Sequence, residues 1–165
     1  MEIRRLTPFD AEIYREIRLE ALKLNAEAYS TRYEDEIERP IKIYQERFRS
    51  NYSFTLGAFE SEKLIGTVTV IREQHLKLHH RVNIVAMYVK PHVRGLGIGK
   101  ALMNEAIQRA REWEGVEQIH LTVVSSNESA RKLYSALGFQ VYGTEKQAMK
   151  LGDTYWDEER MVLFL

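Results

Sequence analysis

The sequence has 165 residues, no cysteine and no excess of either charge. The missing cysteines exclude disulfide bonds, thiolate metal sites and a cysteine nucleophile together. The 24 basic and 24 acidic residues cancel, so the overall charge does not favour nucleic acid or a membrane surface as a partner. No apolar run is long enough to span a bilayer, and Met1–Arg5 lacks the apolar core of a signal peptide. We therefore expect a cytoplasmic protein with no membrane or nucleic-acid partner.

What the sequence contains is the composition of a globular domain, with 44% apolar and 29% charged residues. No repeat, low-complexity segment or linker divides the chain, so we expect a single domain over residues 1–165. Apolar periodicity predicts helices over residues 8–24, 41–49, 102–113 and 130–137. Strands are predicted near residues 3–6, 54–59, 64–71, 82–89, 118–124, 139–143 and 161–165. This order predicts the α/β (α+β) class, a mixed sheet with helices on both sides.

Local signals mark where the helices begin. Thr7 and Asp10 have the spacing of a capping box at the first helix, and Ser125 and Glu128 have it before the last one. The segment 25–40, between the first two helices, is polar and is expected to be irregular.

The most informative segment is a glycine-rich turn, residues 94–100, between an apolar strand and an amphipathic helix. Its backbone N–H groups carry few side chains over them, and such groups at a helix start favour an anion such as phosphate. A Walker A loop would need glycine in place of Arg94 and a hydroxyl in place of Ala101. A dinucleotide-binding turn would need its third glycine one residue after Gly99. Both of these phosphate-binding classes are therefore disfavoured.

The spacing Arg94-x-x-Gly97-x-Gly99 resembles the Arg/Gln-x-x-Gly-x-Gly/Ala turn of the GNAT superfamily of N-acetyltransferases. Residues 127–139 read Asn-x-x-Ala-x-x-Leu-Tyr-x-x-x-Gly-Phe and resemble a second segment of the same superfamily. The resemblance implies a mixed, mostly antiparallel sheet of six or seven strands flanked by about four helices. It also implies that the acetyl group of acetyl-CoA passes to a primary amine of a small molecule or peptide. Two alternatives stay open: a non-catalytic acyl-CoA-binding module of this fold, and a turn whose glycines only allow close packing.

The resemblance further implies where acetyl-CoA binds. The backbone amides of the turn would hold its pyrophosphate, and they belong to Arg94, Gly95, Leu96, Gly97, Ile98, Gly99 and Lys100. The pantetheine arm would pair with the preceding strand like an added strand, at Met87, Tyr88 and Val89. A backbone N–H of Met87 or Tyr88 would polarise the thioester carbonyl. The side chain of Arg94 or Lys100 could add a charge, and Asn127 would bind the pantetheine or cap the last helix.

Tyr134 matches the tyrosine acid of the family, which would protonate the departing thiolate. A free phenol has a pKa of about 10 and a thiol about 8.5, so the phenol is still protonated at neutral pH. The alternative is a core role, because Tyr134 shares its helix face with apolar neighbours. Many members hold a water with a glutamate on the fourth strand; that position is Asn83, which could only orient a water. Glu73, His79 and His80 are the other candidates for the base.

The acceptor site is harder to predict. Four acidic residues between the first two helices would attract a cationic amine, or would only be a solvated surface: Glu34, Asp35, Glu36 and Glu38. Tyr142, Tyr155 and Trp156 would line an acceptor groove or belong to the core. No metal is expected, since the adjacent His79 and His80 would point opposite ways on an extended segment. The C-terminal strand, Met161–Leu165, is expected to be exposed and could pair with a second copy in a homodimer.

Overall fold

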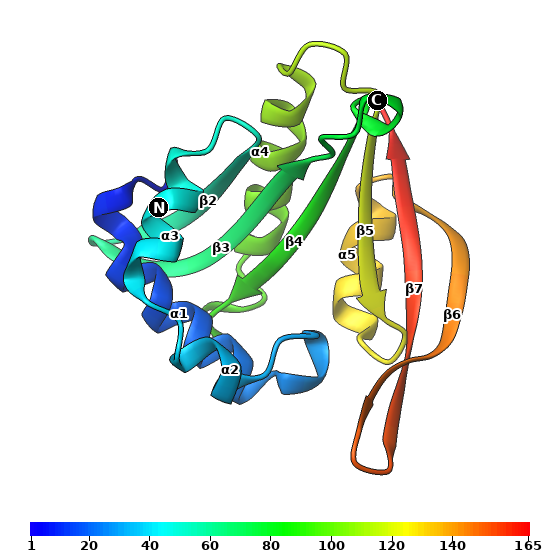
Figure 1. Ribbon diagram of the computed structural model, residues 1–165, viewed down its shortest axis with the longest axis horizontal. Helices are drawn as coiled ribbons and strands as arrows, with labels where there is room; N and C mark the ends of the chain where they lie inside the picture. The colour runs from blue at the N-terminus through cyan, green and yellow to red at the C-terminus, as the bar shows by residue number, and fades with distance from the viewer.

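The computed structural model describes residues 1–165 and contains one seven-stranded sheet with helices on both faces (Figure 1). The strands are β1 (Glu2–Arg5), β2 (Ser53–Glu60), β3 (Lys63–Arg72), β4 (Arg81–Val89), β5 (Gln118–Val124), β6 (Gln140–Leu151) and β7 (Thr154–Phe164). The helices are α1 (Ala11–Leu24), α2 (Tyr33–Ile37), α3 (Ile41–Arg49), α4 (Ile98–Arg111) and α5 (Glu128–Ala136). None of these helices combines the length and the apolar character that crossing a membrane requires.

The strand order in the sheet is β1-β2-β3-β4-β5-β7-β6, and every pair except β4 and β5 is antiparallel. This arrangement confirms the predicted fold class. β4 and β5 pair in parallel only through Arg81–Asn83 and Gln118–His120, and the two strands then separate (Figure 1). Beyond that point the two facing strand edges have no partner strand. The sheet therefore consists of two halves, β1–β4 and β5–β7, that open away from each other.

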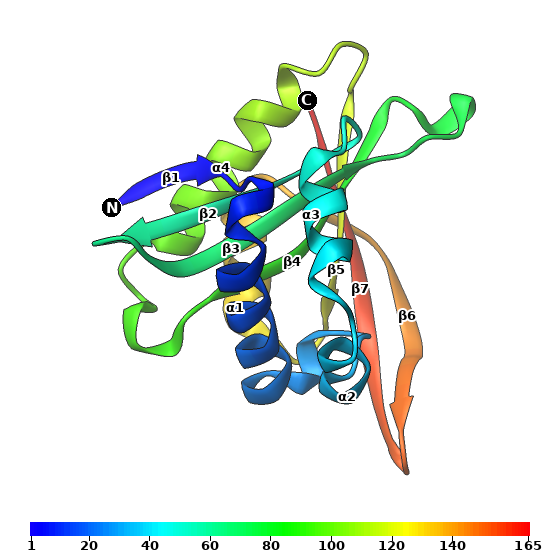
Figure 2. The ribbon, with the colours of Figure 1, turned by 60° about the vertical axis from the view of Figure 1, so that its left-hand side comes forward.

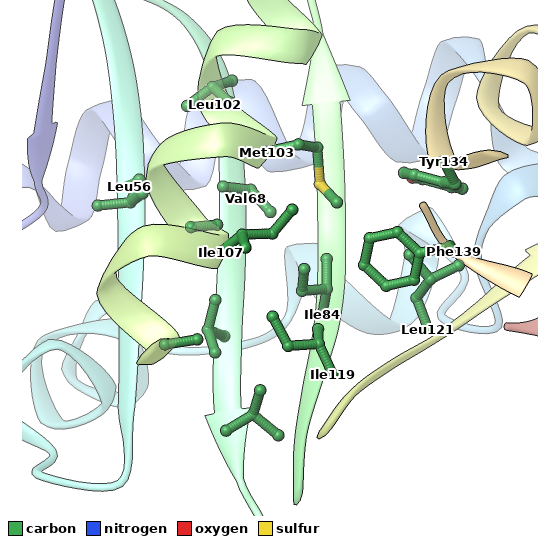
Figure 3. Packing of buried hydrophobic residues seen from close by; sticks show 14 of the residues in the cluster. Leu56, Val68, Ile84, Leu102, Met103, Ile107, Ile119, Leu121, Tyr134 and Phe139 are labelled. Carbon is green, nitrogen blue, oxygen red and sulfur yellow. The ribbon is translucent and has the colours of Figure 1, made fainter. Parts of the chain in front are cut away.

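Two hydrophobic clusters pack against the sheet. The larger one has 21 buried residues beneath α4 and α5, and Figure 3 shows Leu102, Met103 and Ile107 of α4 lying over the strands. The smaller one has ten buried residues beneath α1 and α3, where the rings of Tyr14 and Tyr44 meet edge to face. α1 and α3 cover only the half of the sheet formed by β1–β4 (Figure 2). The same face of β5–β7 carries no helix, which leaves room for a site beside the place where the strands separate.

Two features at the helices differ from the expectation. Asn127 caps the last helix, which is one of the two roles expected of it: its Oδ1 accepts a hydrogen bond from the Ala130 N–H at 3.2 Å. The capping box expected at Ser125 does not form, because the chain stays non-helical for two residues more and the Ser125 hydroxyl is buried without a partner. The segment expected to be irregular contains one short helix, α2. The box of Thr7 and Asp10 does form, with the Thr7 N–H 2.7 Å from Asp10 Oδ2.

The C-terminal strand is not at an exposed edge, so that expectation is wrong. β7 runs over Thr154–Phe164 and is paired with β5 on one side and with β6 on the other. Both edges of Met161 and Val162 are therefore used within the chain, while Leu163 and Phe164 pair with β5 alone. The segment is the end of an interior strand and not the exposed edge strand that was expected. The free edge on this side of the sheet belongs to β6.

Candidate active site

A cavity of about 1190 Å³ opens where β4 and β5 separate. Its walls come from α1 and the segment after it, from α2 and α3, from the strands β3 to β7, and from the N-terminal parts of α4 and α5. Two of the candidates for the general base, Glu73 and Asn83, line this cavity. It is also lined by all the residues proposed above for acetyl-CoA binding and for the acid, apart from Leu96: Met87, Tyr88, Val89, Arg94, Gly95, Gly97, Ile98, Gly99, Lys100, Asn127 and Tyr134. His79 and His80 lie outside it, in the connection between β3 and β4.

The glycines of the turn act in two different ways. Gly97 is the N-cap of α4 and has a φ of 81°, a left-handed conformation that side chains with a Cβ rarely adopt. Gly99 is helical, but a Cβ there would lie 3.3 Å from Met87 Cε and 3.4 Å from Leu133 Cδ2. One glycine therefore sets the direction of the turn and the other allows α4 to approach β4. The first N–H groups of α4 have no acceptor within the helix, and such groups at a helix N-terminus are suited to bind an anion.

The Arg94 side chain is already engaged within the protein. Its Nε donates to the Val89 carbonyl oxygen at 2.9 Å, and one terminal nitrogen donates to Asn25 Oδ1 at 2.8 Å. Arg94 therefore fixes the turn against β4 and the end of α1. Lys100 is exposed and has no ion pair, so it is the cation of the turn that is free to meet a ligand.

A β-bulge interrupts β4 in the wall of the cavity. Val85 lies opposite Thr69 and Tyr88 lies opposite Thr67, so β4 has one residue more than β3 in this interval. Ala86 takes up the extra residue with a φ of 51°. A bulge turns main-chain groups away from the ladder. The Met87 carbonyl oxygen accepts a hydrogen bond of 2.8 Å from the Tyr29 hydroxyl, which reaches it from the segment after α1.

Tyr134 belongs both to the core and to the cavity. Its ring packs edge to face on Phe139 at the margin of the large cluster, as Figure 3 shows, and only 7% of the residue is exposed. Its hydroxyl makes no hydrogen bond within the chain, although the residue lines the cavity. Burial raises the pKa of the Tyr134 phenol above its ordinary value, so the group carries its proton at neutral pH. The two roles weighed for this residue are therefore compatible.

Glu73 and Asn83, proposed separately from the sequence, form a pair. The Asn83 side-chain nitrogen donates to Glu73 Oε1 at 2.7 Å, across the register of β3 and β4. This bond holds one carboxylate oxygen and leaves the other free at the cavity. The pair therefore offers a positioned carboxylate, which is what a proton acceptor requires.

Sequence reasoning missed a histidine in the cavity wall. His120 on β5 has its Nδ1 3.2 Å from a terminal nitrogen of Arg81 and its Nε2 2.9 Å from Gln118 Oε1. Because Arg81 can only donate, Nδ1 accepts and the ring proton sits on Nε2. Burial, and next the charge of Arg81, lower the pKa of His120, so the ring is neutral at neutral pH. A histidine within an apolar strand has no sequence signal that separates it from a core residue.

The acidic residues expected at the acceptor end are not gathered there. Of the four, only Glu36 lines the cavity, and its side chain is almost fully buried. Arg18 and Arg39 lie beside it, and Arg47 lines the same cavity next to the ring of Tyr44. Of the three aromatic candidates Tyr142 reaches the cavity, whereas Tyr155 and Trp156 do not. The chain contains no group of three or more His, Cys, Asp or Glu side chains placed to hold a metal ion.

Known proteins resemble the chain in sequence and in structure. It is 31% identical over 91 residues to the L-amino acid N-acetyltransferase of Escherichia coli, which covers 54% of this chain and 56% of that protein. The match thus spans about half the length of this curated relative. For two other curated relatives, one from Mycobacterium leprae and one from Brachybacterium faecium, it spans 28% of their length. A GNAT-family acetyltransferase from Streptococcus pneumoniae superposes with a TM-score of 0.85 at 22% identity, over 99% of both chains.

Salmonella typhimurium yncA, whose structure contains its cofactor acetyl-CoA, also superposes with a TM-score of 0.85, at 24% identity over 99% of this chain and 93% of that one. At these identities the structural likenesses show the fold. The model of the acetyltransferase (GNAT) family matches residues 15–139, which include both motifs and most of the cavity wall. Because that match extends over most of the sequence, the chain belongs to the GNAT family of acetyltransferases.

Proposed function

We propose that the protein transfers the acetyl group of acetyl-CoA to a primary amine, by direct attack of the amine on the thioester. The observation that carries this proposal is the cavity between β4 and β5, which brings a helix N-terminus, a bulged strand edge and a protonated tyrosine to one place. The acetyl-CoA bound to the Salmonella typhimurium relative of the same fold supports the choice of donor.

The donor is held mainly by main-chain groups. The pyrophosphate binds the N–H groups of residues 94–100 and is favoured by the dipole of α4, with Lys100 adding a positive charge. The amides of the pantetheine arm pair with the free edge of β4 at Met87–Val89, which β5 has left. Asn127 uses Oδ1 to cap α5, and its side-chain nitrogen has no partner within the chain and is free to bind the same arm.

The chemistry follows from the groups around the bulge. The nitrogen of the amine bonds to the carbonyl carbon, and the carbonyl oxygen becomes an oxyanion that accepts a hydrogen bond from the Met87 or Tyr88 N–H. One such donor stabilises a transition state by about 3 kcal/mol. The intermediate then breaks its carbon–sulfur bond, and the thiolate takes its proton from the Tyr134 hydroxyl. The proton lost by the amine passes to Glu73, directly or through a water that Asn83 helps to orient.

Two measurements on the purified chain test this function in turn. Calorimetric titration with acetyl-CoA comes first, and absence of binding would reject both the transferase and the acyl-CoA-binding module. Release of free thiol from acetyl-CoA is then followed with a panel of primary amines, and release that depends on the amine is the expected result. Binding without release on any amine would instead favour the non-catalytic module.

A further inference from the structure

Arg18 is a mostly buried arginine that faces the cavity without a hydrogen bond inside the chain. Its side chain is 12% exposed, and Glu36 Oε1 is 3.8 Å from its Nε, too far for a hydrogen bond. Its guanidinium lies over the ring of Tyr29, 4.8 Å from the ring centroid. A guanidinium carries five N–H donors, and those of Arg18 have no acceptor within hydrogen-bond distance in the chain, so they are left to whatever fills the cavity. A cavity-lining arginine in this condition is suited to an anionic group of a ligand.

The surroundings of Arg18 carry an excess of positive charge. Arg39 has its Nε 3.6 Å from Glu36 Oε2, and Arg47 lies beside the ring of Tyr44 with no carboxylate partner. Glu36 pairs with two of the three arginines, and its side chain is only 2% exposed. All three arginines line the same cavity. Arg18 and Arg39 therefore share one buried carboxylate and Arg47 has none, while Glu27 is a second carboxylate in the wall near Tyr29. Three arginines against two carboxylates leave a positive charge that a further anion would balance.

The position of Arg18 relates this cluster to the reaction centre. Tyr29 stacks under the guanidinium and donates its hydroxyl to the Met87 carbonyl at the β4 bulge. Burial raises the pKa of Tyr29 to about 12, so this donor keeps its proton. A single tyrosine ring thus separates the cluster from the strand edge where the thioester is proposed to lie. The turn that is proposed to hold the pyrophosphate meets α1 at Asn25, roughly 10 Å further along the helix.

We propose that the acceptor is a small amine that also carries a carboxylate, and that Arg18 binds this carboxylate with support from Arg39 and Arg47. The inference rests on the proposed acetyl transfer and names its substrate class. A guanidinium fork matches a carboxylate through two parallel hydrogen bonds. With the carboxylate at Arg18, the amine of a short molecule reaches the bulge on the far side of Tyr29. The structure favours this acceptor over the cationic amines that the acidic segment 34–38 suggested, since only Glu36 of that segment lines the cavity.

The test compares matched acceptors that differ only in charge. The acids are glycine, β-alanine and 4-aminobutyrate together with larger α-amino acids, each measured against its carboxamide, with 1,4-diaminobutane as a cationic amine. We expect kcat/KM from thiol release to be about 10- to 100-fold higher for the best acid than for its amide. Arg18→Met should remove most of this ratio by raising KM for the acid, and Arg18→Lys should restore part of it. Arg39→Gln, at a more exposed position, should give a smaller change of the same kind.

Arg49→Met provides the matched control. Arg49 is exposed on α3 outside the cavity, so its loss removes the same charge without touching the proposed site. In Arg49→Met, the ratio of kcat/KM for the acid to kcat/KM for its amide should equal that of the unchanged protein. Acetyl-CoA affinity, measured separately, reports whether Arg18→Met has kept its fold and its donor site.

Each outcome bears on a different claim. Equal use of acids and amides, or preference for the diamine, would overturn the carboxylate assignment while acetyl transfer itself stood. Preference for 2-aminoethylphosphonate over β-alanine would also overturn it, in favour of a phosphoryl group. Acetyl-CoA binding with no release on any acid would overturn it as well. Failure to bind acetyl-CoA would instead reject the proposed function.

Discussion

The two ends of the cavity are built from different parts of the chain. The end at α4 consists of main-chain groups in consecutive residues, shaped by Gly97 and Gly99. The opposite end contains long charged side chains from the first three helices, from the end of β3, and from β4 and β7, which meet only in the folded protein. A main-chain site needs particular residues at fixed spacing, so it leaves a motif. A side-chain site needs no spacing at all, and the acceptor end therefore has no motif that identifies it.

Tyr134→Phe tests the point where the two ends meet, and it has the largest expected effect. Removal of the hydroxyl takes away the proton for the thiolate and keeps the ring that packs on Phe139. General acid catalysis contributes about 10²- to 10⁴-fold, so kcat should fall by about 100-fold or more. Acetyl-CoA affinity, measured by calorimetry, should stay the same. Full turnover at saturating substrate would mean that Tyr134 is only a core residue.

Glu73→Gln tests the acceptor end alone. The amide keeps the size of the side chain and can still meet Asn83, but it cannot accept the proton of the amine. We expect kcat at pH 7 to fall by about 10- to 100-fold. The deficit should shrink as the pH approaches the pKa of the amine, because the substrate then arrives deprotonated.

The profile of rate against pH for Glu73→Gln, compared with the unchanged protein, decides between two roles. A deficit that stays constant with pH would show that Glu73 only positions the substrate. Asn83→Ala serves as the companion variant. It frees the Glu73 carboxylate without removing it, so kcat at pH 7 should fall less than in Glu73→Gln.

Gly97→Ala tests the donor end and has a matched control elsewhere in the chain. Gly97 and Gly115 have φ values of 81° and 77°, so alanine is strained by about 1 kcal/mol at either position. Both variants should therefore lower the melting temperature by a similar amount. Only Gly97→Ala should also weaken acetyl-CoA binding, by about tenfold, because its N–H groups belong to the anion site. Equal affinity in both variants would contradict the placement of the pyrophosphate.

The same contrast explains which parts of the fold the sequence could predict. All seven strands were expected, but the last two were expected over only five residues each, at 139–143 and 161–165. In the structure β6 has 12 residues and β7 has 11. Much of β6 is exposed on both faces, so its residues do not alternate between apolar and polar and its length has no signature. Strand order and the burial of β7 depend on pairing between distant segments, which local patterns do not encode.

The site shows a similar division. The cap that Asn127 makes on α5 was one of the two roles expected of it from the sequence. The contacts that engage Arg94 were not predictable from the spacing of the motif. Arg94 meets Asn25 only because α1 ends beside the turn. Glu36 stands in an acidic run that reads as surface, yet it is buried because arginines and Tyr44 surround it. Such roles follow from tertiary contacts alone.

His120 allows a final test of the acceptor end, through stability instead of rate. Burial and the charge of Arg81 lower the pKa of His120 in the folded protein below its ordinary value of about 6.5. The unfolded chain therefore binds the proton more readily, and this residue makes the protein lose stability as the pH falls below about 6.5. In His120→Gln that part of the pH dependence should be absent, although the melting temperature at pH 7.5 changes little if Gln118 and Arg81 find the new amide. Melting curves of both proteins between pH 7.5 and 5.5 measure the difference. Parallel curves would mean that the ring is solvated enough to titrate normally, and that this wall of the cavity is open to water beside Arg81.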